Sequence, residues 1–114
     1  MNNKLDQIFD MQEALNKRLG VPDFTLMAKV DRSDWGLKFS RALIHEVIEF
    51  ERELAFKHWK KNQPIDIKKA AEEAVDCMHF LVSMCQAMGM SADDLFYLYL
   101  EKNKVNHERQ ENGY

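Results

Sequence analysis

The sequence predicts an all-α protein, a helical bundle with two long antiparallel central helices, and two observations lead to this fold class. Only 4 glycines and 2 prolines interrupt the 114 residues, and the alternation of Val, Ile and Thr that marks β-strands is missing. The hydrophobic fraction of 46% and the charged fraction of 31% are ordinary for a globular protein. A chain of this length builds one hydrophobic core, so residues 1–114 are expected to form a single domain.

The first two helices are indicated by apolar periodicity and by the breaks that follow it. Apolar side chains at helical spacing predict a first helix over about 5–19, which ends at Gly20. The less regular stretch 21–36 is expected to be a connection with a short turn. A second helix is expected to begin near 33–37 and to continue to about residue 60, before the break at 62–64.

The third and fourth helices have clear start signals. Asp66 is a good N-cap for a third helix, which continues up to Gly89. Ser91 caps a fourth helix that runs from about 92 to at least 106, and Asp94 completes a capping box. Because only a short loop is expected between the second and third helices, these two long helices should pack antiparallel.

Charge and cysteine content indicate which partners and which cellular compartment to expect. The net charge of -3 is opposite to the basic surplus of a sequence-independent nucleic-acid binder, so no nucleic-acid partner is expected. Cys77 and Cys85 lie on one predicted helix, about 12 Å apart along its axis, which is too far for a disulfide. Free thiols, the lack of a membrane-spanning apolar run and the lack of a signal-peptide pattern together favour the cytoplasm, with no membrane partner.

Two acidic stripes lie on the two most apolar helices. In the stretch 42–50 the polar residues are His45, Glu46 and Glu49, and at 100° per residue they share one side of the helix. On the third helix, Glu73 and Asp76 share one side in the same way. If the stripes face each other, four carboxylates converge and repel one another unless cations lie between them.

The alternative is that these acids form a solvated helix face. Both helices are too apolar to leave much exposed surface, and therefore a metal site is favoured. Carboxylates without thiolates suit hard cations such as Mg²⁺ or Mn²⁺. Since Mg²⁺ takes only one or two carboxylates and fills its other positions with water and phosphate oxygens, four carboxylates fit two or more ions that can bind a polyphosphate.

With these residues in hand, the sequence resembles the all-α nucleoside triphosphate pyrophosphatase superfamily. The signature of that superfamily is an E-x-x-E pair on one helix and an E-x-x-D pair on the next, here Glu46–Glu49 and Glu73–Asp76. Within the superfamily, the chain is most similar to the dimeric dUTPases. The supporting stretches are Met11-Gln12 with Leu15, the run Phe56–Lys60, His79-Phe80-Leu81 after Asp76, and Lys102–Gln110 with Gly113-Tyr114.

The resemblance implies Mg²⁺-dependent hydrolysis of dUTP to dUMP and pyrophosphate. It implies that both acid pairs hold Mg²⁺, with Mn²⁺ as a substitute, and that Glu46 or Glu49 orients or deprotonates the attacking water. The substrate-binding residues that it implies are Gln12 at the uracil edge, Trp59 and Phe80 around base and sugar, Lys102, Asn103, Asn106 and Arg109 at the phosphates, and Tyr114 near the nucleoside.

Each implied substrate contact also has a purely structural interpretation. Trp59 and Phe80 fit a hydrophobic core, and the run 102–109 fits a solvated helix end with favourably placed cations. Gln12 is different, because it lies in line with apolar side chains and a buried amide needs hydrogen-bond partners.

Other functions remain open on the residues alone. Asp76-Cys-Met-His79 imitates the Glu-x-x-His spacing of di-iron carboxylate bundles, but the sequence has no second such motif. A non-catalytic dimerisation module would leave the acidic stripes unexplained. A sister pyrophosphatase that acts on another standard or modified nucleotide is the main alternative, because the acid pairs are common to the superfamily.

The assembly state is also predicted. Helices this apolar, in a chain this short, should leave an exposed apolar patch unless another subunit covers it. We therefore expect a homodimer or a dimer of dimers with two-fold symmetry.

Overall fold

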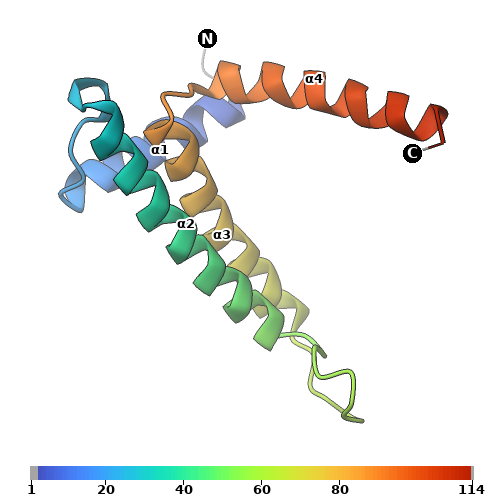
Figure 1. Cartoon of the computed structure of the whole chain (residues 1–114). Helices are drawn as coiled ribbons and strands as arrows, with labels where there is room; N and C mark the ends of the chain where they lie inside the picture. Colours follow the sequence, from blue (N-terminus) through green and yellow to red (C-terminus); the bar gives the residue numbers. More distant parts are fainter. Residues whose placement is uncertain (1–2, 114) are drawn as a thin grey trace.

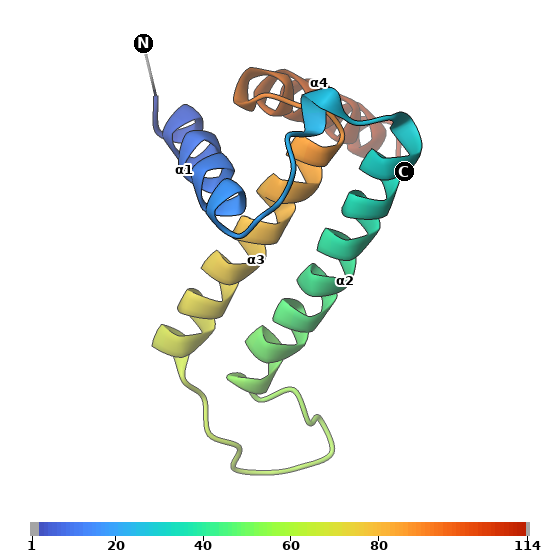
Figure 2. The ribbon, with the colours of Figure 1, turned by 90° about the vertical axis from the view of Figure 1, so that its left-hand side faces the viewer.

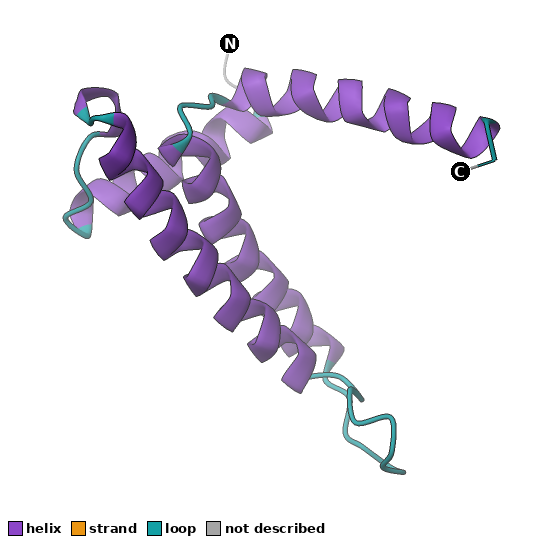
Figure 3. Ribbon diagram, in the orientation of Figure 1, coloured by secondary structure: helices purple, strands orange, loops and turns teal. Residues whose placement is uncertain are grey.

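The computed structural model describes residues 3–113, which form four α-helices and one short 3-10 helix and contain no strand. In chain order the elements are α1 (Lys4–Arg18), η1 (Phe24–Leu26), α2 (Lys29–Arg52), α3 (Ile67–Ala87) and α4 (Ala92–Glu111). Figures 1 and 3 show α2 and α3 as long antiparallel neighbours, and Figure 2 shows α1 beside the upper half of α3. The predicted all-α fold with two long central helices is confirmed.

The hydrophobic core lies where α1, α3 and the start of α4 meet. Its buried members are Phe9 on α1, Val82 and Cys85 on α3, and Ala92 on α4. Both cysteines are free thiols, as the sequence predicts. None of the helices within residues 3–113 has the length and hydropathy that a membrane crossing requires.

The start signals of the two C-terminal helices are confirmed. The Asp66 carboxylate accepts a hydrogen bond from the backbone N–H of Lys69 at 3.0 Å, which caps α3. Ser91 and Asp94 form the predicted capping box at the start of α4. Gly89, with a φ of 82°, follows the end of α3 in the left-handed region that favours glycine.

The predicted bounds of the second helix are wrong at both ends. α2 begins at Lys29, earlier than 33–37, and it ends at Arg52, before residue 60. The connection expected over 21–36 is correspondingly shorter. The loop between α2 and α3 therefore covers 53–66 and is longer than the short connection around 62–64 that the sequence predicts.

Specific hydrogen bonds hold this longer loop and keep α2 beside α3. The backbone N–H of Asp66 donates to the carbonyl of Glu53 at 2.8 Å and closes the base of the loop. Within the loop, the backbone N–H of Lys57 donates to the side-chain oxygen of Gln63 at 2.9 Å, and Asn62 turns the chain with a φ of 56°. The antiparallel pairing expected from a short loop is therefore formed by a longer one.

Three aromatic rings hold η1 against the first half of α2. The ring of Phe24 lies edge-on to those of Trp35 and Phe39, with centroids 6.5 and 6.1 Å apart, and Trp35 lies 5.6 Å from Phe39. Edge-on pairs of this kind add to the stability that burial provides. They fix the path of the connection between α1 and α2.

One side chain ties the start of α2 to the end of α3. Arg32 Nε donates to the carbonyl of Ala87 at 2.9 Å, which satisfies one of the carbonyl groups left unpaired at the end of α3. Gly89 lies so close to this guanidinium that a Cβ at that position would collide with Nη2 of Arg32. The contact joins the two long helices at the end opposite to the 53–66 loop.

We expect Gly89→Ala to lower the free energy of unfolding by about 1–3 kcal/mol, because an L-residue is strained at positive φ and its Cβ would displace Arg32. Gly20→Ala is the matched control, since Gly20 has a φ of 85° but no atom within 4 Å of an added Cβ. Chemical denaturation compares the two variants. Equal losses would contradict the Arg32 contact.

Candidate metal centre

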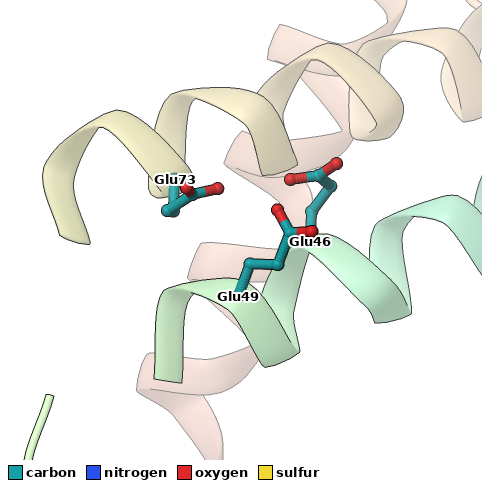
Figure 4. Close-up of side chains that lie close together, drawn as sticks. All are labelled: Glu46, Glu49 and Glu73. Atoms are coloured by element: carbon teal, nitrogen blue, oxygen red, sulfur yellow. The ribbon is translucent and has the colours of Figure 1, made fainter. Parts of the chain in front are cut away.

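Three of the predicted carboxylates meet between α2 and α3. One oxygen from each of Glu46, Glu49 and Glu73 lies within 4.8 Å of the others. Figure 4 shows the three side chains reaching toward one another from the two facing helices. Glu46 and Glu49 are almost one helical turn apart, which places both on the side of α2 that faces α3.

The fourth predicted carboxylate, Asp76, is close enough to act on this group electrostatically but does not belong to the cluster of three. Its side chain is exposed on α3, and its oxygens are outside the 4.8 Å cluster. Its negative charge nevertheless contributes to raising the pKa of Glu46 and of Glu73. All four acids therefore interact electrostatically.

Two carboxylate oxygens in this group are buried and unpaired. Oε2 of Glu46 and Oε2 of Glu73 have no hydrogen-bond partner in the described part of the chain. Burying a polar atom without a partner is costly, and burying a charge is more so. A cation between the helices would satisfy both atoms, and an all-oxygen donor set is the one that Mg²⁺ and Mn²⁺ prefer. The residues present therefore fit the divalent cation that the sequence predicts.

Crowding of the acids shifts their protonation toward neutral pH. Burial, followed by the charges of Glu49, Asp76 and Glu46, raises the pKa of Glu73 to about 7. Burial, together with contact and charge repulsion from Glu49, also raises the pKa of Glu46. Without a cation the cluster retains protons in this range, and a bound cation would compete with them.

The residues implied to contact the base occupy different environments. Trp59 lies in the 53–66 loop with 70% of its surface exposed, packed edge-on against His58 at 5.1 Å between centroids. Trp59 is therefore not part of the core in this chain. Phe80 is half-buried on α3, and Gln12 is buried on α1.

The C-terminal motif lies apart from the carboxylates. Lys102, Asn103, Asn106 and Arg109 are exposed on α4, and Figure 1 shows α4 leading away from the α2–α3 pair. A single chain therefore does not bring this motif to its own acidic cluster. Tyr114 lies outside the described residues.

A cavity of about 610 Å³ is bordered by α1, η1 and the start of α4, and it includes none of the clustered carboxylates. Asn16 lines this cavity. The acidic cluster therefore does not line this cavity.

Gln12 belongs to a closed set of hydrogen bonds between α1 and α3. Its Nε2 donates to Asn16 Oδ1 at 3.0 Å, and Asn16 Nδ2 donates to Ser83 Oγ at 3.0 Å. Ser83 Oγ donates to the carbonyl of His79 at 2.9 Å, and the Nδ1 of His79 lies 2.6 Å from Gln12 Oε1. We call these four residues the amide network.

The amide network was predicted only in part. The expectation that Gln12 needs buried partners is confirmed, whereas Asn16 and Ser83 were not identified as those partners. One signal was present in the sequence: Asn16 follows Gln12 by four residues, and Ser83 follows His79 by four, so each pair is adjacent on a helix face.

A helical bundle whose central pair carries facing E-x-x-E and E-x-x-D motifs is the arrangement expected of the all-α nucleoside triphosphate pyrophosphatases. Comparison with known families narrows this class, because the sequence matches the dUTPase family over residues 4–86 and 83–114. The chain belongs to this dUTPase family.

Two curated phage proteins are similar to this chain. The dCTP pyrophosphatase of Enterobacteria phage T4 is 47% identical over 51 residues, which are 45% of this chain and 30% of the phage protein. The dCTP pyrophosphatase of Enterobacteria phage LZ5 is 35% identical over 78 residues, 58% of this chain and 45% of that protein. The chain thus spans less than half the length of these relatives. No solved structure matches it.

In metal-free buffer we expect the protein to lose stability as the pH rises from about 5 to 8. The folded-state pKa of Glu73, about 7, lies above its ordinary value of 4.5, so the folded state binds more protons than the unfolded state between these values. Stability then falls with increasing pH across this interval. Melting temperatures in the presence of EDTA measure the effect.

Glu73→Gln should flatten this dependence and melt above the wild type at pH 8, because one of the repelling charges is removed. Glu72→Gln is the matched control, since Glu72 is an exposed acid beside Glu73 but outside the cluster. A wild-type melting temperature that rises between pH 5 and 8 would show that the cluster is not strained by its charges.

Proposed function

We propose that the protein is a Mg²⁺-dependent nucleoside triphosphate pyrophosphohydrolase that converts dUTP to dUMP and pyrophosphate. The observation that carries this proposal is the convergence of Glu46, Glu49 and Glu73, with two buried oxygens left unpaired. The family match supports the same reaction class, as does the pyrophosphatase name of the two phage relatives.

The acid pairs of α2 and α3 would hold the cation. Only with the cation bound would these carboxylates accept a polyanionic substrate, because the bare carboxylates repel its phosphates. A bound Mg²⁺ would neutralise phosphate charge and lower the pKa of a water molecule. Glu46 or Glu49 would orient the attacking water and accept its proton, and the raised pKa of Glu46 suits this exchange near neutral pH. The new bond joins the water oxygen to one phosphorus atom of the α–β bridge, and the bond between that phosphorus and the bridging oxygen breaks, which releases dUMP and pyrophosphate.

The choice of dUTP rests on the family match and on Gln12. An amide carries one donor group and one acceptor group, so in one of its two orientations Gln12 would complement the uracil edge, and Trp59 and Phe80 would enclose the base and the sugar. dCTP is the second candidate, because both phage relatives are named for it.

A homodimer, or a dimer of dimers, is the second part of the proposal. The run Leu95–Leu100 consists of large apolar residues, of which Phe96 to Leu100 are 46–67% exposed. The chain exposes 9187 Å², whereas a compact protein of 13.5 kDa exposes about 6,500 Å². Its radius of gyration is 17.3 Å, against about 13 Å for a compact chain of this length. The difference in area is of the size that obligate homodimers bury.

Such a dimer would also complete the site. Because α4 leads away from its own acidic cluster, the residues Lys102, Asn103, Asn106 and Arg109 would serve the carboxylates of the other protomer. The phosphate-binding residues and the cation-binding residues would then come from different chains.

With Mg²⁺ and dUTP, the purified protein should release pyrophosphate and dUMP but no orthophosphate, and EDTA should abolish the activity until Mg²⁺ or Mn²⁺ is restored. Glu49→Gln and Asp76→Asn should each abolish turnover in a folded chain, while Glu72→Gln should retain it.

In a nucleotide panel, dTTP should be cleaved about 10–200-fold less efficiently than dUTP, because a close wall around the ring rejects the 5-methyl group. Orthophosphate release, or full turnover by the Glu49→Gln, Glu73→Gln double variant, would exclude the proposed reaction.

Sedimentation at micromolar concentration should show a dimer or tetramer, and Leu98→Glu with Leu100→Glu should dissociate it. Lys104→Glu, an exposed polar position on the same helix, is the matched control. Only monomer in the wild type would contradict the assembly.

Completion of the site by the partner predicts complementation between two inactive variants. When Glu49→Gln and Lys102→Ala chains are mixed, half of the dimers should be mixed, and each should hold one intact site, so about a quarter of the activity returns. No recovery after subunit exchange would show that each chain builds its own site.

A further inference from the structure

In the amide network, the choice of donor and acceptor in one hydrogen bond determines the choice in the next. The network ends on the backbone carbonyl of His79, a group that only accepts hydrogen bonds. Ser83 has a single hydroxyl proton, which is committed to this carbonyl at 2.9 Å. Ser83 Oγ must therefore act as the acceptor in its 3.0 Å contact with Asn16.

This order of donors and acceptors determines the orientation of both amides. Because Asn16 Nδ2 donates to Ser83, Asn16 Oδ1 faces α1 and accepts from Gln12 Nε2 at 3.0 Å. Gln12 Oε1 is then the atom that lies 2.6 Å from His79 Nδ1, and this ring nitrogen must carry the proton. If only one of the two amides were flipped, its oxygen would face the other amide's oxygen, or its N–H group would face the other amide's N–H group.

Water can reach the network at its His79 end but is poorly placed at the other three residues. His79 is exposed, whereas Gln12 and Asn16 are each 6% exposed and Ser83 is 1% exposed. A buried donor or acceptor that faces its own kind loses its hydrogen bond and regains none from solvent. The buried contacts of Asn16 and Ser83 therefore favour the orientation seen for Gln12 over the flipped one.

The orientation of Gln12 has a chemical consequence for a pyrimidine base. After its bonds within the network, the amide still has one N–H and one oxygen lone pair. Uracil has a donor at N3 and an acceptor at O4, whereas cytosine has an acceptor at N3 and a donor at N4. An amide held in one orientation complements one of these patterns, and the flipped amide complements the other.

We propose that Ser83, Asn16 and His79 are positioning residues that hold the Gln12 amide in one orientation and thereby decide which pyrimidine base the site accepts. This inference rests on the proposed function. His79 is three residues beyond Asp76, about 4.5 Å along the axis of α3, so the amide network lies beside the carboxylates on the same helix.

Ser83→Ala tests the inference with the smallest change, because it removes the anchoring proton and little volume. The ratio of kcat/KM for dUTP to that for dCTP should fall by about tenfold or more, while kcat for dUTP changes little. Ser40→Ala is the matched control: Ser40 Oγ donates to the carbonyl of Leu37 at 2.8 Å, outside the network. Its ratio should equal that of the wild type.

A double-variant comparison separates positioning from a general structural effect. Gln12→Ala should itself lower efficiency on dUTP and narrow the margin over dCTP. In the Gln12→Ala background, Ser83→Ala should not change the ratio further, because it acts only through the amide. An additional fall in the ratio would overturn the inference.

The protonated ring nitrogen provides a readout without substrate. ¹⁵N chemical shifts of the neutral His79 ring should show the proton on Nδ1 in the wild type and a shift toward Nε2 in Ser83→Ala, where both amides can flip. A proton on Nε2 in the wild type would overturn the inference even if Ser83→Ala does not fold.

The outcomes distinguish this inference from the proposed function. Hydrolysis of neither dUTP nor dCTP overturns both. Equal hydrolysis of the two by the wild type, or an unchanged ratio in Ser83→Ala, overturns the inference and leaves the pyrophosphohydrolase reaction in place.

Discussion

Repulsion among carboxylates on two facing helices is the constraint on which the rest of the structure depends. Antiparallel packing of α2 and α3 brings Glu46, Glu49 and Glu73 together, and apolar burial elsewhere must offset the unfavourable charge. The helices cannot relieve the repulsion by separating, since Arg32 holds the start of α2 at the end of α3 and the Asp66–Glu53 bond closes the other end. Charges held together in this way favour cation binding, because each cation removes a penalty that the fold already contains.

An element of the fold could be predicted from the sequence when the interactions that determine it join residues close together in the chain. The N-caps at Asp66 and Ser91 were predictable, because each involves residues three positions apart. The end of α2 was not, because residues 53–60 continue a helical pattern and the competing turns use partners farther along the chain. The backbone hydrogen bond from Asp66 to Glu53 is one such contact, since it joins two residues that are far apart in the chain.

The same distinction separates the predicted from the unpredicted parts of the site. The acid pairs were predicted because i,i+3 spacing places both acids on one helix face. Asn16 is a local partner of Gln12, but Ser83 is 67 residues from Asn16, and their contact depends on where α1 crosses α3. The direction of α4 likewise depends on the turn between α3 and α4 at Gly89–Ser91. The motif at 102–109 therefore identified candidate residues, but the sequence did not predict where they lie.

Under the proposed function, α3 combines two tasks that can vary independently. Its first half carries Glu73 and Asp76, which would hold the cation at the phosphates. Its second half carries His79 and Ser83, which would orient Gln12 at the base. The family is that of the dUTPases, yet the phage relatives are named for dCTP. Because the amide network is oriented by a single hydroxyl proton, a change in base preference would require only a reversal of its hydrogen bonds. The acid pairs, and with them the reaction, would remain as they are.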